Sequence, residues 1–170
     1  NPDQSNFTKI ELRVGRITKV WNHETAERLY CEEVDIGAGE PRQVASGLRG
    51  IYSLEEMQDR LVIVVCNLKE AKMKGFISQG MVLAAKSADG SVQLIEPPEG
   101  SKVGDLIDCE GVERDGPAWP ASTVKNKKIW EAMSADLHTG ENGLPYWGTH
   151  LLITPAGPCK ATSIFSSPIS

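Results

Sequence analysis

Lysine side chains gather in two short windows of this sequence, and ammonium groups at such a density are typical of a surface that binds a polyanion. Residues 67–75 (NLKEAKMKG) and residues 123–130 (TVKNKKIW) together hold 6 of the 18 basic residues and 1 of the 23 acidic residues. The remaining sequence therefore has 12 basic and 22 acidic residues, within a formal net charge of −5 for all 170 residues. The windows predict a basic face on an otherwise acidic protein.

The first window is bordered by residues that could add hydrogen bonds and apolar contact. Asn67 follows an apolar stretch, and Ser78 and Met81 stand where the next apolar stretch begins. Hydroxyl and amide groups suit phosphate and ribose contacts, and a methionine thioether offers a soft apolar face to a base. A simpler interpretation is that the lysines are solvated, with the stems of Lys125 and Lys128 covering apolar surface.

Several short stretches with alternating apolar and polar residues indicate β-strands. The change of phase near Gly15 predicts a bulge or bend in the first strand. Ser53 and Glu56 have the spacing of a capping box and predict a short helix that ends near Asp59. Strands are expected at 11–20, 29–36, 42–46, 61–67, 81–86, 92–95 and 106–109. Three strands, a helix and further strands are the order of a five-stranded OB-fold barrel, a mostly β fold, although propensity alone does not separate it from other small barrels.

The chain after the predicted barrel has a different pattern. Residues 111–122 contain two glycines, two prolines and no periodicity, which predicts a linker. A helix at 123–133 and strands at 148–154 and 159–164 predict a small α+β extension over residues 123–170. Residues 1–6 are expected to be a polar leader before a barrel domain at 7–110. The sequence has no initiator methionine, so we expect a piece of a longer protein.

Composition excludes several classes of protein. Hydrophobic residues make up 40% and charged residues 24% of the chain, a globular balance that argues against disorder. The longest apolar run, 61–66, is far shorter than the roughly 18 residues that a membrane span needs, so no membrane partner is expected. Cys31, Cys66, Cys109 and Cys159 are widely spaced in apolar segments. We therefore expect reduced, buried thiols and a cytoplasmic location.

No catalytic, metal or cofactor site is expected. The sequence lacks G-x-S-x-G, G-x-x-x-x-G-K-[ST] and H-E-x-x-H. His23, His138 and His150 are scattered, and the alternating Asp105, Asp108 and Glu110 are typical of a solvated strand end. These observations predict a non-catalytic module.

Residues 67–75, followed by ISQGM at 77–81, resemble the signature of tRNA-binding OB domains of the endothelial-monocyte-activating polypeptide II type. In that family the domain is appended to some eukaryotic tyrosyl- and methionyl-tRNA synthetases or belongs to synthetase auxiliary factors. Further similar stretches occur in the same order at 12–37, 41–48, 54–69 and 125–131. The resemblance covers most of the chain, including its C-terminal part.

The resemblance implies a tRNA contact surface and no catalytic residue. The implied contacts are Asn67, Lys69, Lys72, Lys74, Ser78, Met81, Arg42, Lys125, Lys127 and Lys128. It also implies that the extension imitates the dimer interface of bacterial homodimers, so that the domain is a monomer with Trp119 and Trp130 buried against the barrel. The family usually has proline in place of Glu70 and arginine in place of Lys74.

The expected function is structure-dependent, largely sequence-independent binding of tRNA. Such a module would raise the tRNA affinity of an aminoacyl-tRNA synthetase in cis or in a complex. The alternative is a cytokine-like or protein-docking role, because residues 13–19 (RVGRITK) resemble the segment associated with cytokine activity in secreted family members. As a barrel strand, this segment would instead have Val14 and Ile17 facing inward.

Overall fold

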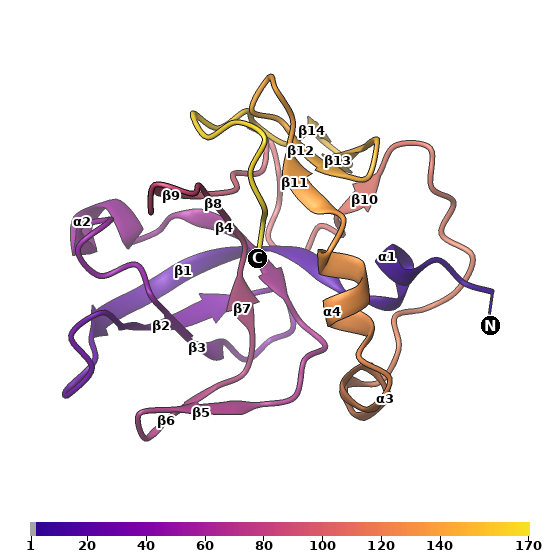
Figure 1. The fold of residues 1–170 in the computed structure, drawn as a ribbon. Coiled ribbons are helices and arrows are strands. Elements are labelled where there is room, and N and C mark those ends of the chain that lie inside the picture. Colours follow the sequence, from indigo (N-terminus) through magenta and orange to yellow (C-terminus); the bar gives the residue numbers. More distant parts are fainter. Residues whose placement is uncertain (1–2) are drawn as a thin grey trace.

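Strands between residues 12 and 82 form a five-stranded antiparallel sheet, as the computed structural model of residues 3–170 shows (Figure 1). Its strands, in the order β3-β2-β1-β4-β7, are β3 (Arg42–Ser46), β2 (Tyr30–Asp35), β1 (Leu12–Asn22), β4 (Leu61–Val65) and β7 (Met81–Val82). The sheet curls until β3 approaches the residues that precede β7, where the backbone N–H of Gln79 donates to the carbonyl of Gln43 at 2.6 Å. The predicted OB-type barrel and mostly β class are confirmed.

The irregularity predicted near Gly15 in the long strand β1 occurs a few residues later, because β1 pairs with β4 without a break across Gly15. A Cβ atom at this glycine would lie 2.8 Å from Val34 Cγ1 and 2.9 Å from Val64 Cγ2, so the barrel interior leaves no room for a side chain there. The pairing of β1 with β2 shifts register between Ile17 and Lys19. Val14 and Ile17 are three residues apart, so the alternation of the strand places them on opposite faces and in different cores, rather than both inside the barrel as expected.

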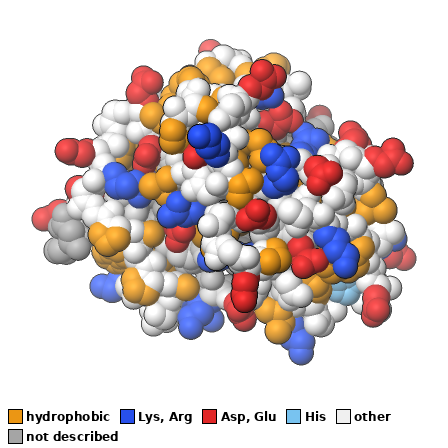
Figure 2. All heavy atoms as spheres, turned by 180° about the vertical axis from the view of Figure 1, so that it is seen from behind, with side chains coloured by type: hydrophobic (Ala, Val, Ile, Leu, Met, Phe, Trp, Pro, Cys, Tyr) orange, Lys and Arg blue, Asp and Glu red, His pale blue; other side chains and the backbone are white. Residues whose placement is uncertain are grey.

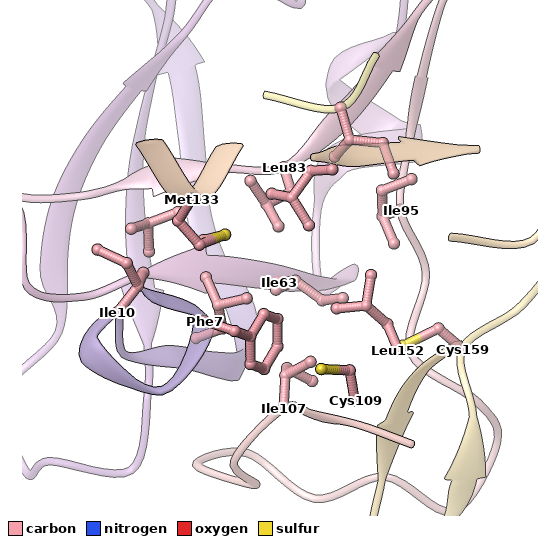
Figure 3. Packing of buried hydrophobic residues seen from close by; sticks show 14 of the residues in the cluster. Phe7, Ile10, Ile63, Leu83, Ile95, Ile107, Cys109, Met133, Leu152 and Cys159 are labelled. Carbon is pink, nitrogen blue, oxygen red and sulfur yellow. The ribbon is translucent and has the colours of Figure 1, made fainter. Parts of the chain in front are cut away.

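Two hydrophobic cores share the central strands. On β4, Val62 and Val64 point into the barrel, whereas Ile63 and Val65 point outward, as the two-residue period of a strand requires. The outward side chains pack against the C-terminal extension in an interface core. Figure 3 shows Ile63 and Leu83 of the barrel beside Met133 and Leu152 of the extension.

The extension consists of two short helices and a small antiparallel sheet. Its elements are α3 (Ala121–Asn126), α4 (Ile129–Ser134), β10 (Asp108–Cys109), β11 (Leu137–Thr139), β12 (Pro145–Trp147), β13 (His150–Thr154) and β14 (Gly157–Pro158). The prediction of one continuous helix at 123–133 is wrong, because Lys128 has a left-handed backbone (φ 53°) between α3 and α4. The predicted strand at 159–164 is also absent. This segment instead leads to residues 168–169, which form bridges with β11 and β8.

Contacts in the structure cross the boundaries that the sequence predicts between leader, barrel, linker and extension. Strand β10, from the predicted barrel domain, pairs with β13 of the extension. Gln4, from the predicted polar leader, is buried and binds the Pro117 carbonyl and the Trp119 indole N–H, just before helix α1 (Asn6–Lys9). Residues 1 and 2 of that leader lie outside the described residues. Barrel, linker and extension therefore pack as one body.

Three small elements complete the fold. Helix α2 (Leu54–Met57) has the predicted capping box of Ser53 and Glu56. Strands β8 (Ala84–Lys86) and β9 (Val92–Leu94) form one hairpin, and β5 (Ala71–Met73) and β6 (Phe76–Ser78) form another. The β5–β6 hairpin lies where the sequence predicts only a loop.

The four cysteines are free and buried, as predicted. Burial raises the pKa of Cys66 to about 11 and the pKa values of Cys109 and Cys159 to about 12, so these thiols are protonated near neutral pH. No helix within residues 3–170 has the length and apolar character needed to cross a bilayer.

Candidate nucleic-acid interface

The β5–β6 hairpin carries the first lysine window on a narrow projection. Lys74 and Gly75 form its two-residue turn, and both have positive φ values, 53° and 88°. Positive φ at both positions is the requirement of a type I′ turn, whose twist matches that of the flanking strands. In Figure 1 this hairpin extends to the lower edge of the molecule, away from the extension's sheet.

The three lysines lie at different places around the hairpin, because Lys69 precedes β5, Lys72 is within β5 and Lys74 is in the turn. Ala71 and Met73 face the barrel, so Lys72 points to the opposite side. Lys69 lines a cavity of about 310 Å³ between the hairpin and the barrel. Lys74 lines a separate hollow of about 340 Å³ on the side of the β1–β2 loop. All three side chains are exposed, so a bound polyanion could contact the hairpin from several sides.

Asn67 lies at the base of the hairpin, where its side chain is buried and bonded to other parts of the protein. Its side chain is only 8% exposed, and its Nδ2 donates to the carbonyls of Lys9 (2.8 Å) and Trp119 (2.9 Å). Its Oδ1 accepts the backbone N–H of Glu11 at 2.9 Å. These bonds occupy the amide inside the protein, so Asn67 fixes the base of the hairpin.

Ser78 is likewise buried and hydrogen-bonded inside the protein. It is 3% exposed, accepts the N–H of Ala45 at 3.0 Å and donates its hydroxyl to the Gly80 carbonyl at 2.9 Å. These bonds join β6 to β3 where the barrel closes. Ser78 thus fixes the hairpin against the barrel.

Arg42 and Glu70 lie in a hollow on the other side of the same loop. The Arg42 guanidinium is half-buried and donates to the carbonyls of Cys66 and Gln79 (3.1 Å to Gln79). Gln79 in turn donates its Nε2 to Glu70 Oε1 at 3.2 Å. Glu70 therefore bonds to an amide, and Arg42 has donors to spare for a ligand at the edge of this hollow.

The second lysine window forms the α3–α4 corner. Lys125, Lys127 and Lys128 are all exposed, and Lys127 Nζ lies 6.0 Å from the centre of the Trp119 ring. Trp119 and Trp130 are half-buried against the interface core, in the place that the family resemblance implies. Because Asn67 binds the Trp119 carbonyl, the hairpin base and the start of α3 are adjacent, and Figure 1 shows both elements on the lower side of the molecule.

None of the six lysines in the two windows forms an ion pair with a carboxylate inside the described part of the chain; the ion pairs there involve other residues. Elsewhere the surface charge is mixed: Figure 2 shows acidic and basic side chains interspersed over the rear face. The ammonium groups of the windows are therefore available for phosphates, which would not have to displace a carboxylate partner.

His23 is a residue whose importance the sequence interpretation missed. Its Nδ1 accepts the N–H groups of Thr25 (3.1 Å) and Ala26 (3.0 Å), which places the ring proton on Nε2. Nε2 then donates to the Met73 carbonyl at 3.2 Å, between Lys72 and Lys74. The imidazole also contacts Phe76 edge to face at 6.5 Å. His23 thus ties the β1–β2 loop to the hairpin, and these two loops border the ligand-binding face of OB folds.

Comparisons with known proteins agree with this architecture. Residues 12–106 match the family model described as "Putative tRNA binding domain". The cytoplasmic methionine–tRNA ligase of Arabidopsis thaliana is 44% identical over 96% of this chain and 20% of that protein. The aminoacyl tRNA synthase complex-interacting multifunctional protein 1 of Cricetulus griseus is 41% identical over 96% of this chain and 45% of that protein.

A solved structure extends the similarity to the whole chain. The C-terminal domain of Plasmodium vivax p43 superposes with a TM-score of 0.87 at 28% identity, covering 96% of this chain and 98% of that domain. The chain spans a fifth of the Arabidopsis protein and less than half of the Cricetulus protein. The match over the barrel, the relatives that also contain the extension and the shared fold together place this chain in the family of tRNA-binding domains of the endothelial-monocyte-activating polypeptide II type.

Proposed function

We propose that this domain binds folded tRNA, mainly through its phosphates and sugars, with the exposed lysines of the hairpin and of the α3–α4 corner as direct contacts. The observation that carries the proposal is that six exposed lysines lie on the hairpin and the α3–α4 corner, which are joined through the bond of Asn67 to Trp119. None of the six has an ion pair within residues 3–170. Asn67, Ser78 and His23 position the hairpin. Arg42 and Met81 are further contacts at its base.

The mechanism is electrostatic capture. Point charges on flexible lysine stems attract phosphates without reading base edges, so selectivity comes from the shape of the folded RNA. The methionine–tRNA ligases among the relatives support the proposal that this domain is a non-catalytic part of a cytoplasmic synthetase or of an auxiliary factor. A domain that holds tRNA near a catalytic site raises its effective concentration there.

A cytokine-like role has less support from the folded domain. Residues 13–19 belong to β1, whose residues 12–16 pair with β4 and whose residues 16–22 pair with β2. Arg13 binds Glu11 at 2.6 Å and the Gly104 carbonyl at 2.9 Å, and Val14 and Ile17 are buried. A partner that recognised this whole segment would have to open the barrel first.

The proposal is tested by measuring tRNA affinity across a salt series, with an RNA duplex and a single strand as competitors. Engagement of roughly three to five phosphates predicts a log–log slope of about −2 to −4.5. The double variant Lys72→Ala/Lys74→Ala is expected to weaken binding on the order of tenfold and to make the slope shallower by about 1 to 2.

Exposed lysines outside the two windows provide the matched control. Lys102→Ala/Lys160→Ala removes the same number of charges from other parts of the surface. This control should keep its affinity for tRNA. An equal loss in both double variants would assign binding to net charge and would contradict a defined surface, and absent binding by the unmodified domain would overturn the proposed function.

A further inference from the structure

The cavity of about 310 Å³ beneath the hairpin is unusual for a basic surface, because its walls are apolar. It lies between the barrel-facing side of the β5–β6 hairpin and strands β3, β7, β8 and β9. Leu48, Met73, Met81, Val82 and Val92 supply most of its large side chains. We call it the hairpin cavity.

Two lysines border this apolar space. Lys69 and Lys86 line the hairpin cavity and are both exposed, as is Ala71 at its edge, so the cavity opens to solvent beside positive charge. No aspartate or glutamate is among the residues that line it. Lys86 Nζ also donates to the Ser170 hydroxyl at 3.1 Å, which leaves further donors on the same ammonium group.

The polar groups in the wall have partners within the protein. The Ser46 hydroxyl donates to the Glu32 carboxyl group, and the Ser78 hydroxyl donates to Gly80. The cavity is therefore suited to a largely apolar, flat group that carries an anion next to it. A nucleotide has this composition: the base is a polarizable ring, and its phosphate stays outside.

We propose that the hairpin cavity receives one unstacked nucleobase of the bound tRNA, held between Met73 and Met81, with the adjoining phosphates at Lys69 and Lys86. The inference rests on the proposed function and names the contact that adds to phosphate capture. Loops of folded RNA present unstacked bases, and thioether side chains adapt to rings of different size, so this contact tolerates different bases.

The four methionines of the chain make a direct test possible. Met73 and Met81 line the hairpin cavity, whereas Met57 and Met133 are 0% exposed in the two cores. With ¹³C-methyl-labelled methionine, addition of tRNA should shift the Met73 and Met81 signals by the ring current of the base. The Met57 and Met133 signals should stay in place as internal controls.

A cavity-filling variant separates this contact from the lysines. Ala71→Phe puts a ring at the mouth of the hairpin cavity and removes no charge. It should weaken tRNA binding on the order of tenfold, which corresponds to the loss of one base contact, while the salt slope stays unchanged. Ala88→Phe, in an exposed turn outside the cavity, is the matched control and should bind as the unmodified domain does.

The outcomes distinguish the two proposals. Salt-dependent tRNA binding without shifts of Met73 and Met81, or with equal affinity for Ala71→Phe and Ala88→Phe, would overturn the base contact and leave phosphate capture intact. Absent tRNA binding would instead overturn the proposed function itself.

Discussion

Glu32 lies inside the barrel, on the same face of β2 as the buried side chains of Tyr30 and Val34. The Ser46 hydroxyl donates to its Oε2, but its Oε1 has no hydrogen-bond partner within residues 3–170. Burial raises the pKa of Glu32 from 4.5 to about 8, against the smaller lowering by Ser46. The carboxyl group is therefore protonated in the folded protein at neutral pH.

This pKa predicts a pH-dependent stability. Between pH 4.5 and about 8 the folded state binds a proton that the unfolded state has released, so the free energy of unfolding falls as the pH rises through this window. Glu32→Gln should remove this fall and stabilise the protein at about pH 8.5 by a few kcal/mol, on the order of the pKa difference converted to free energy. Urea unfolding between about pH 5 and pH 8.5 measures both effects.

The neighbouring residue Glu33 serves as the control. It is half-exposed, and its carboxylate lies 4.0 Å from Lys19 Nζ on the other side of the sheet. Glu33→Gln should retain the pH dependence of the unmodified domain. Parallel pH profiles of the unmodified protein and Glu32→Gln would contradict the assignment to Glu32.

At the scale of elements, the hairpin depends on a contact from a different loop. The imidazole of His23 donates from Nε2 to the Met73 carbonyl, while its Nδ1 accepts the N–H groups of Thr25 and Ala26 in the β1–β2 loop. The imidazole shares the hollow of about 340 Å³ with Glu24, Cys31 and Lys74. Arg49 donates to the His23 carbonyl at 3.4 Å. Loss of this contact would free the turn that carries Lys74.

A double-mutant cycle tests this positioning role. His23→Ala should weaken tRNA binding about three- to tenfold, because the loss of the hydrogen bond that positions the turn costs roughly 0.5 to 1.5 kcal/mol. In a Lys72→Ala/Lys74→Ala background the same substitution should have almost no effect, because the side chains that it positions are gone. Equal losses in both backgrounds would mean that His23 stabilises the domain without a specific link to the hairpin.

At the scale of the whole molecule, barrel and extension share the interface core, so they are expected to unfold together. Met133, from α4, is completely buried beside Ile63 and Leu83 of the barrel. In urea, the methyl signals of Met57 in the barrel and of Met133 should lose intensity at the same midpoint. Met133→Ala should lower the free energy of unfolding by about 2 to 4 kcal/mol and shift the Met57 midpoint with it.

The contrary result is a barrel that stays folded when the extension unfolds. A Met57 signal that persists beyond the loss of the Met133 signal would show two independent units. It would also remove the expectation that the extension covers the outer barrel face and keeps the domain monomeric.

Local sequence patterns determined the β-strands of the barrel, the presence of an irregularity in the first strand, the capping box at Ser53 and the two lysine windows. These features depend on alternation and spacing within a few residues, which the sequence displays directly. The family resemblance, carried by long stretches in order, is confirmed by the match at residues 12–106 and by the structure of the Plasmodium vivax domain.

Only the tertiary structure decided which of the predicted contact residues are buried and which are exposed. Asn67 and Ser78 have the hydrogen-bonding groups of contact residues, but their partners come from Lys9, Trp119 and Ala45, which are distant in the chain. Strand pairing also separated the three hairpin lysines, and packing created the hairpin cavity between them and the barrel. The physical reason is that burial and hydrogen-bond partners depend on long-range pairing, which a local pattern of residue types leaves open.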